Sequence, residues 1–120
     1  MKKEHIYDLV ANFLELLSKK NFNKLNTDFN LTYPIYEEIF EELENNSLEN
    51  ETLTLADKEM ALNNLNENRA VFEVYSMNNK DEYGVECAIF ANKKITDLTL
   101  EGNVFQREDK IEFRYKLIRS

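Results

Sequence analysis

The sequence predicts an α+β fold in which N-terminal helices pack on one face of a four-stranded antiparallel meander sheet. Apolar residues recur with a helical period in the first half of the chain and alternate with polar residues after about residue 70. The alternating segments are separated by turns of a few residues, and turns this short join neighbouring antiparallel strands. We therefore expect one domain over residues 1–120, with helices over about 4–66 and the sheet over about 70–118.

The helical half contains two strong helix patterns and an asparagine-rich stretch between them. Residues 4–19 place apolar side chains at the i, i+3, i+4, i+7 spacing of an amphipathic helix. Residues 21–30 are expected to form a packed loop. A second helix is expected to begin at Thr32-Tyr33-Pro34, because proline suits a first helical turn, and to end at 45–47. The side chains that would form its buried stripe are Ile35, Ile39 and Leu43, widened by Tyr36 and Phe40.

A third helix is predicted from the capping box Thr54-Leu55-Ala56-Asp57. In such a box, side-chain oxygens accept hydrogen bonds from N–H groups that the first helical turn leaves unpaired. The helix is expected to run to about Leu65. Its apolar side would consist of Leu55, Met60, Leu62 and Leu65.

The second half contains strand patterns, the first over residues 71–77 and the last ending at Leu117. Every second residue of the last three strands is apolar or small, so one face of the sheet is expected to meet the helices. The expected core-facing residues are Tyr83, Val85, Cys87 and Ile89, then Thr96, Leu98, Leu100, Gly102 and Val104, then Ile111, Phe113, Tyr115 and Leu117.

The balance of charge excludes two classes of partner. Fifteen Lys and Arg residues against twenty-three Asp and Glu residues give a formal net charge of −8. Binding to phosphate backbones depends on releasing counterions from the nucleic acid, so no nucleic-acid partner is expected for a chain of this sign. The same repulsion argues against an anionic membrane surface, and no apolar run approaches the roughly 18 residues that span a bilayer. We expect a basic protein as the partner.

Acidic residues are concentrated in residues 37–51, which contain seven glutamates and no Lys, Arg or Asp. Two adjacent rows of these glutamates have helical spacing and can face outward from the second helix. The alternative is that the run is only a solvated helix face and loop. The residues expected to bind a partner are Tyr36, Glu37, Glu38, Phe40, Glu41, Glu42, Glu44, Glu49 and Glu51.

The chain carries little that catalysis or a cofactor would need. Gly84 and Gly102 are its two glycines, so it has no glycine-rich phosphate loop. His5 is its one histidine and is expected to be solvated. Cys87 is its one cysteine and, on the apolar face of a strand, is expected to be a small buried side chain rather than a nucleophile. We expect no enzyme activity, no cofactor and no metal, and the lone cysteine favours the cytoplasm.

Three carboxylates on the predicted sheet include a candidate acid–base pair. Asp97 and Glu101 share one strand face, and Glu86 on the neighbouring strand is expected to approach one of them. Two carboxylates about 5–9 Å apart can act as acid and base where a pocket raises the pKa of one of them. We favour the alternative that these are ordinary charges on the solvent-exposed face, balanced by Lys93 and Arg114.

Several short segments between Tyr83 and Leu117 are distinctive as a set. They are Ala88-Ile89-Phe90, Thr96-Asp97-Leu98-Thr99-Leu100-Glu101 and Ile111-Glu112-Phe113. In these segments the chain resembles a small bacterial family of uncharacterised function with an NTF2-like or cystatin-like fold, which implies helices wrapped by a curved antiparallel sheet. As a small acidic chain rich in Asn and Lys, it also resembles in general type the immunity proteins of contact-dependent growth inhibition toxin systems.

Two functional hypotheses follow from charge and resemblance. The first is a cytoplasmic immunity protein that binds a basic bacterial toxin domain, expected to be a nuclease, and neutralises it by occluding its site. The alternative is an NTF2-like domain without catalysis that either binds a small ligand between helices and sheet or acts as an adaptor that forms a homodimer through its open sheet face. A ligand pocket would need convergent polar groups, whereas the inward positions assigned above are mainly apolar.

Overall fold

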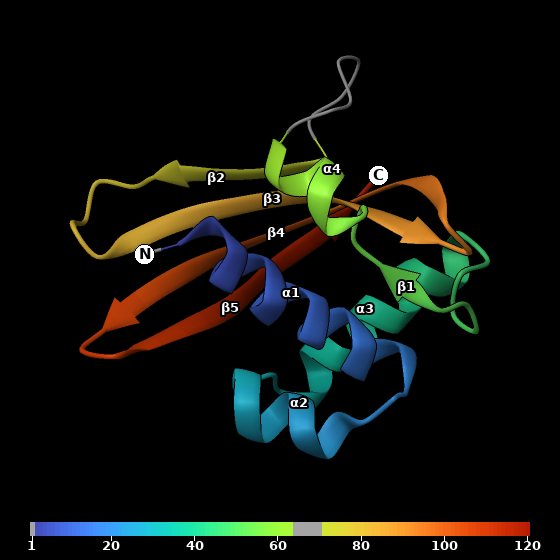
Figure 1. The fold of residues 1–120 in the computed structure, drawn as a ribbon. Helices are drawn as coiled ribbons and strands as arrows, with labels where there is room; N and C mark the ends of the chain where they lie inside the picture. The colour runs from blue at the N-terminus through green and yellow to red at the C-terminus, as the bar shows by residue number, and fades with distance from the viewer. Residues whose placement is uncertain (1, 64–70) are drawn as a thin grey trace.

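The structure is a computed structural model that describes residues 2–63 and 71–120. It confirms the α+β class, because N-terminal helices lie against one face of a curled antiparallel sheet (Figure 1). The helices are α1 (Lys3–Ser18), α2 (Phe22–Phe29), α3 (Tyr33–Asn45) and α4 (Lys58–Asn63). The strands are β1 (Leu53–Thr54), β2 (Phe72–Ser76), β3 (Glu82–Ala91), β4 (Lys94–Arg107) and β5 (Lys110–Arg119).

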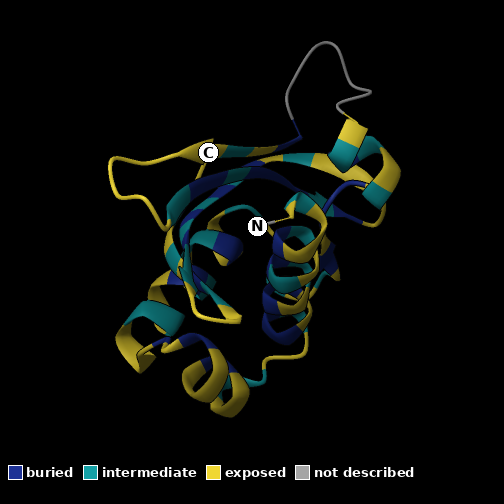
Figure 2. Cartoon of the chain, turned by 60° about the vertical axis from the view of Figure 1, so that its left-hand side comes forward, coloured by how far each residue is buried: buried dark blue, intermediate teal, exposed yellow. Residues whose placement is uncertain are grey.

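Helix α1 runs along the concave face of the sheet and turns its buried side toward it (Figure 2). The buried side chains follow the predicted helical spacing, and Val10, Phe13 and Leu17 are fully buried. Phe13 meets Phe29 of α2 and Phe113 of β5 edge to face, with ring centroids 5.3 Å apart in both pairs. One aromatic ring of α1 therefore joins α2 and the sheet into the same core.

Residues 22–29 form helix α2, so the prediction of a loop over 21–30 is wrong. The side chain of Asn21 caps the helix by accepting a hydrogen bond from the N–H of Lys24 at 3.1 Å. Asn30 ends it with a φ of 55°, a left-handed conformation that asparagine tolerates. Two of the four asparagines that suggested a loop, Asn21 and Asn30, are the caps of this short helix, and Leu25 and Phe29 form its buried side.

Helix α3 confirms the prediction from residues 32–47. It begins at Tyr33, carries Pro34 in its first turn and ends at Asn45. Ile39 and Leu43 are buried and hold the helix against the core, Ile35, Tyr36 and Phe40 are partly buried beside them, and the opposite side faces solvent.

The third predicted helix begins later than the capping box suggested. Thr54 belongs to strand β1, and the first turn of α4 starts where the N–H of Ala61 donates to the carbonyl of Asp57 at 2.8 Å. The N–H of Leu53 donates to the hydroxyl of Ser18 at 2.8 Å, and β1 pairs with the end of β3. Tertiary hydrogen bonds therefore outweigh the local capping signal at Thr54. The predicted end of the helix at Leu65 lies outside the described residues.

The sheet contains the four predicted strands as the antiparallel meander β2–β3–β4–β5 and adds β1 as a fifth. Strand β3 pairs with β4 along one edge. Its other edge is shared, with β2 against residues 83–87 and β1 against residues 90–91. The short β1 thus ties the segment between α3 and α4 to the sheet.

The alternation of side chains along β5 changes phase near its end. The pairing of β4 with β5 shifts by one residue after Glu101, which leaves Lys116 as the extra residue of a β-bulge. Ile118 is buried beyond the bulge and Leu117 is only partly buried, so the prediction that Leu117 lies on the core face is wrong. The same shift turns Arg119 to the outer face of the sheet.

Candidate partner-binding surface

The five glutamates of α3 form two rows on the sides of the helix that the core does not cover. Successive residues of an α-helix are turned by about 100°, and the buried Ile39 and Leu43 define the core side. The row next to Tyr36 and Phe40, the aromatic-side row, consists of the exposed Glu37, Glu41 and Glu44. The row next to Ile35, the sheet-side row, consists of Glu38 and Glu42. Both rows correspond to the predicted helical spacing.

Four aromatic rings from α2 and α3 form a cluster outside the main core, here called the aromatic cluster. Phe22 lies edge to face against Tyr33 and Tyr36, with ring centroids 5.2 Å apart in each pair. Tyr36 also contacts Phe40 at 4.8 Å and stacks on Tyr33 at 5.9 Å. Tyr33 is 54% exposed, whereas burial, followed by the proximity of Tyr33, raises the pKa of Tyr36. The cluster therefore combines three partly buried rings, Phe22, Tyr36 and Phe40, with the solvent-exposed ring of Tyr33.

The charge of the aromatic-side row is not compensated within the described part of the chain. No glutamate of α3 forms an ion pair with a described residue, whereas Glu4 and Glu15 of α1 bind Lys58 and Lys19. Lys20 lies beside the cluster, with its ammonium 5.9 Å from the centroid of the Phe40 ring. The surface can therefore attract a cationic partner and offer it apolar contact area.

The sheet-side row faces strand β5 instead. Burial raises the pKa of Tyr115 to about 12, and the charges of Glu38 and Glu42 act in the same direction. This coupling places the sheet-side row near Tyr115 and away from the aromatic cluster. The sheet-side row therefore borders β5, whereas the aromatic-side row borders the aromatic cluster.

Glu49 and Glu51 lie beyond α3, in the segment before β1, and belong to neither row. Glu51 accepts a hydrogen bond of 2.7 Å from the side-chain amide of Asn92 in the turn between β3 and β4. One carboxylate oxygen of Glu49 is buried and has no hydrogen-bond partner among the described residues. Of the predicted set, the structure thus brings together Tyr36, Phe40 and the aromatic-side row.

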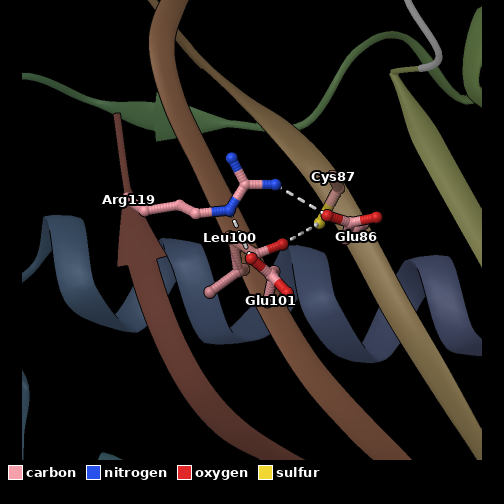
Figure 3. A network of polar contacts seen from close by, with 5 residues as sticks. All are labelled: Glu86, Cys87, Leu100, Glu101 and Arg119. Atoms are coloured by element: carbon pink, nitrogen blue, oxygen red, sulfur yellow. Dashed lines mark hydrogen bonds and ion pairs between the residues drawn. The ribbon is translucent and has the colours of Figure 1, made fainter.

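Glu86 and Glu101, two of the three carboxylates of the candidate acid–base pair, form an ion-pair network with Arg119 on the outer face of the sheet (Figure 3). Glu86 and Glu101 are directly opposite each other, and Arg119 donates to both, at 2.8 Å to Glu86. These hydrogen bonds, the one to Glu101 first, raise the pKa of the Arg119 guanidinium. The expectation that Lys93 and Arg114 balance these charges is wrong, because the bulge in β5 brings Arg119 to them.

Asp97 lies at the same face but outside this network. It lines a hollow of about 410 Å³ together with Glu73, Glu86, Thr99 and Arg119. Arg114 instead pairs with Glu112 at 3.7 Å and lies over the ring of Phe105. Around the hollow, three carboxylates therefore surround Arg119, whose hydrogen bonds link β5 to β3 and β4.

Cys87 and His5, the other candidate reactive residues, lie in opposite environments. Cys87 is 1% exposed, burial raises the pKa of its thiol, and its sulfur lies 3.8 Å from the carbonyl oxygen of Leu100 (Figure 3). His5 is exposed. Over residues 2–63 and 71–120, no group of three or more His, Cys, Asp and Glu side chains is placed to hold a metal ion. A buried, protonated thiol is a poor nucleophile.

Sequence reasoning missed two members of the aromatic cluster, Phe22 and Tyr33. Tyr33 has a local signal, because it precedes Tyr36 by three residues and so lies on the same helix face. Phe22 has none, because its contact depends on how the connection between α2 and α3 is folded. There the side-chain amide of Asn26 donates to the carbonyl of Leu31 at 2.9 Å.

The described helices include none that is long and apolar enough to cross a bilayer. Comparisons with models of protein families, with curated proteins and with solved structures gave no match to this chain. The function of the surface is therefore inferred from its own chemistry.

Proposed function

We propose that this protein is an immunity protein that binds a basic bacterial toxin domain, a nuclease, and neutralises it by occluding its site. The observation that carries the proposal is the aromatic cluster beside a row of uncompensated glutamates on α3. A nuclease cleft that holds phosphates is cationic, so it complements such a row. In this proposal the protein binds stoichiometrically, without catalysis, cofactor or metal.

The two parts of the surface have different roles in the proposed complex. The carboxylates act at a distance and accelerate the encounter with a cationic partner, an effect that added salt screens. The tyrosines act at contact, because large aromatic side chains supply much of the affinity at interface centres. Both kinds of side chain come from one helix, so a single cleft can engage them together.

For the fold we propose the NTF2-like or cystatin-like arrangement, which the curled sheet around α1 supports. For the compartment we propose the cytoplasm, which the free, buried thiol of Cys87 supports because reducing conditions preserve thiols. Both proposals agree with a protein that intercepts a toxin inside the cell.

The alternative functions receive less support from the geometry. A small ligand at the centre of the layer between helices and sheet would need space, but Phe13, Leu100 and Phe113 are only 0–2% exposed. A hollow of about 450 Å³ lies between α1 and β1 instead, where Tyr7, Ser18 and Thr54 line it. Dimerisation through the open sheet face would bring the carboxylates of two copies together, because Arg119 already pairs with its own Glu86 and Glu101.

The proposal is tested by capture, identification and inhibition. The immobilised protein captures a partner from a lysate of the source organism, and the partner is identified and purified. Its nuclease activity is then measured against rising amounts of this protein. We expect a basic domain whose nuclease activity is lost at a one-to-one ratio. A captured protein that is acidic, or that retains full activity at saturation, would refute the proposal.

A pair of matched variants locates the interface. The first variant carries Gln in place of the aromatic-side row, Glu37, Glu41 and Glu44. The control carries Gln in place of Glu59, Glu73 and Glu108, which are also exposed. Both remove three charges from the net charge of −8 and keep side-chain size. We expect the first variant alone to lower the association rate, by about tenfold at low salt and less at high salt. Equal effects would place the interface elsewhere.

A further inference from the structure

The aromatic cluster already holds one cation of the protein itself. The ammonium of Lys20 lies over the ring of Phe40, with a centroid distance of 5.9 Å, and donates to the side chain of Asn50 at 3.0 Å. Tyr33, at the other end of the cluster, is 54% exposed and has no cation over its ring among the described residues. The cluster therefore offers a second ring where a cation from outside can bind.

A carboxylate stands next to that ring. Glu37 follows Tyr33 by four residues. Residues four apart on a helix are neighbours on one face, with Cβ atoms about 5–6 Å apart. Glu37 is exposed and has no ion-pair partner within the described residues. An aromatic face and an uncompensated carboxylate are thus presented together by one turn of α3.

This pair of groups suits arginine better than lysine. A guanidinium is planar, so it can stack on an aromatic ring while its N–H groups donate to a carboxylate in a fixed fork. An ammonium is a compact and strongly hydrated charge that gains less from the ring. A surface with carboxylates but no aromatic ring would bind arginine and lysine with more similar affinities.

We infer that this surface selects arginine over lysine, so that the bound segment of the partner places an arginine on Tyr33 and Glu37. The inference rests on the proposed function and deepens it, because it names the side chain that the toxin domain presents. The arginine stacks on the solvent-exposed part of the Tyr33 ring, away from its contacts with Tyr36 and Phe22, and donates to the carboxylate of Glu37. Glu41, one further turn along the helix, extends the site for a second basic residue.

The test compares an oligoarginine with an oligolysine peptide of equal length and label. Their dissociation constants for the full chain are measured by fluorescence anisotropy at about 150 mM salt, where long-range attraction is screened. We expect oligoarginine to bind roughly three- to tenfold more tightly. In Tyr33→Leu this ratio should fall below about twofold, while the oligolysine constant stays within about twofold of the parent value.

Tyr75→Leu is the matched control. Tyr75 is 42% exposed on β2. Burial, followed by the charges of Glu86, Glu101 and Glu73, raises its pKa, so it too is an exposed tyrosine beside carboxylates. The arginine preference should survive this change. Equal constants for the two peptides in the parent protein, or a preference that survives Tyr33→Leu, would overturn the inference.

Failure of the inference can be told apart from failure of the proposed function. If Gln in the aromatic-side row slows capture of the toxin domain but the peptides bind alike, the function stands and the arginine site is refuted. If Tyr33→Leu abolishes the peptide preference but Gln in the aromatic-side row leaves capture of the toxin domain unchanged, the arginine site stands and the proposed interface is refuted. Circular dichroism shows whether each variant is folded, and Glu37→Gln provides a second variant that leaves the rings in place and should also lower the preference.

Discussion

Replacing Phe113 by alanine tests the packing that joins helices to sheet. Phe113 is 2% exposed, and its ring contacts Phe13 at 5.3 Å and Phe29 at 6.4 Å. Emptying a buried phenylalanine site costs about 3–5 kcal/mol, because both transfer energy and contacts are lost. A domain of 120 residues has a total stability of about 6–18 kcal/mol, so the change removes a large part of it.

Gly102 makes the prediction sharper because it lies under the same ring. A Cβ on Gly102 would lie 2.4 Å from a ring carbon of Phe113 and 2.6 Å from the carbonyl oxygen of Arg114. Gly102→Ala alone should therefore destabilise the protein by about 1–3 kcal/mol through overpacking. With Phe113→Ala in the same chain, the new methyl group occupies part of the vacated space. We expect the double variant to lose about 1 kcal/mol less than the two single losses combined.

Urea unfolding followed by circular dichroism measures these changes. With a slope of about 1.5 kcal/mol per molar urea, a loss of 3 kcal/mol lowers the midpoint by about 2 M. Lys116→Ala, at the exposed bulge residue of β5, is the control and should stay within about 0.5 kcal/mol. A Phe113→Ala loss below about 1 kcal/mol, or strictly additive single changes, would refute the packing described here.

Three further predictions concern single sites. Cys87 should react with a thiol reagent far more slowly in the native protein than in urea, because burial keeps its thiol protonated and covered; equal rates would contradict its burial. Lys93→Gly should raise the free energy of unfolding by about 0.5–1 kcal/mol, because Asn92 and Lys93 have φ values of 52° and 66° in the hairpin turn and glycine adopts such angles without strain. Stability should fall as pH rises from 10 to about 12, because Tyr115 ionises in the unfolded chain near 10 but keeps its proton in the folded protein. Tyr115→Phe should reduce that dependence, as measured by urea unfolding at each pH.

Local sequence patterns were sufficient for the elements whose signal lies within one segment. The proline at the start of α3 marks a first helical turn, where its missing N–H costs no hydrogen bond. The apolar period of α1 and the alternation along β4 each reflect how one segment divides its side chains between core and water. The two rows of glutamates on α3 were predictable for the same reason. Whether those rows bind a partner stays a prediction.

Other features needed contacts between segments that are distant in sequence. Strand β1 exists because Leu53 pairs with Ala91 and donates to Ser18, neither of which a capping pattern at Thr54 can reveal. Phe22 joins the aromatic cluster only because α2 folds back on α3. Both features depend on hydrogen bonds and packing between distant segments, and the free energy of these contacts competes with local secondary-structure propensity.

The bulge in β5 shows most clearly what the sequence determined and what it left to the fold. The sequence determined that residues 111–115 alternate between core and solvent, because burial of every second side chain is a property of the strand itself. If that alternation continued unchanged past residue 115, the side chain of Arg119 would face the core. A charged side chain there would lack water and partners, whereas one extra residue at Lys116 places Arg119 between Glu86 and Glu101. The register of a strand belongs to the pair of strands, so only the tertiary structure could decide it.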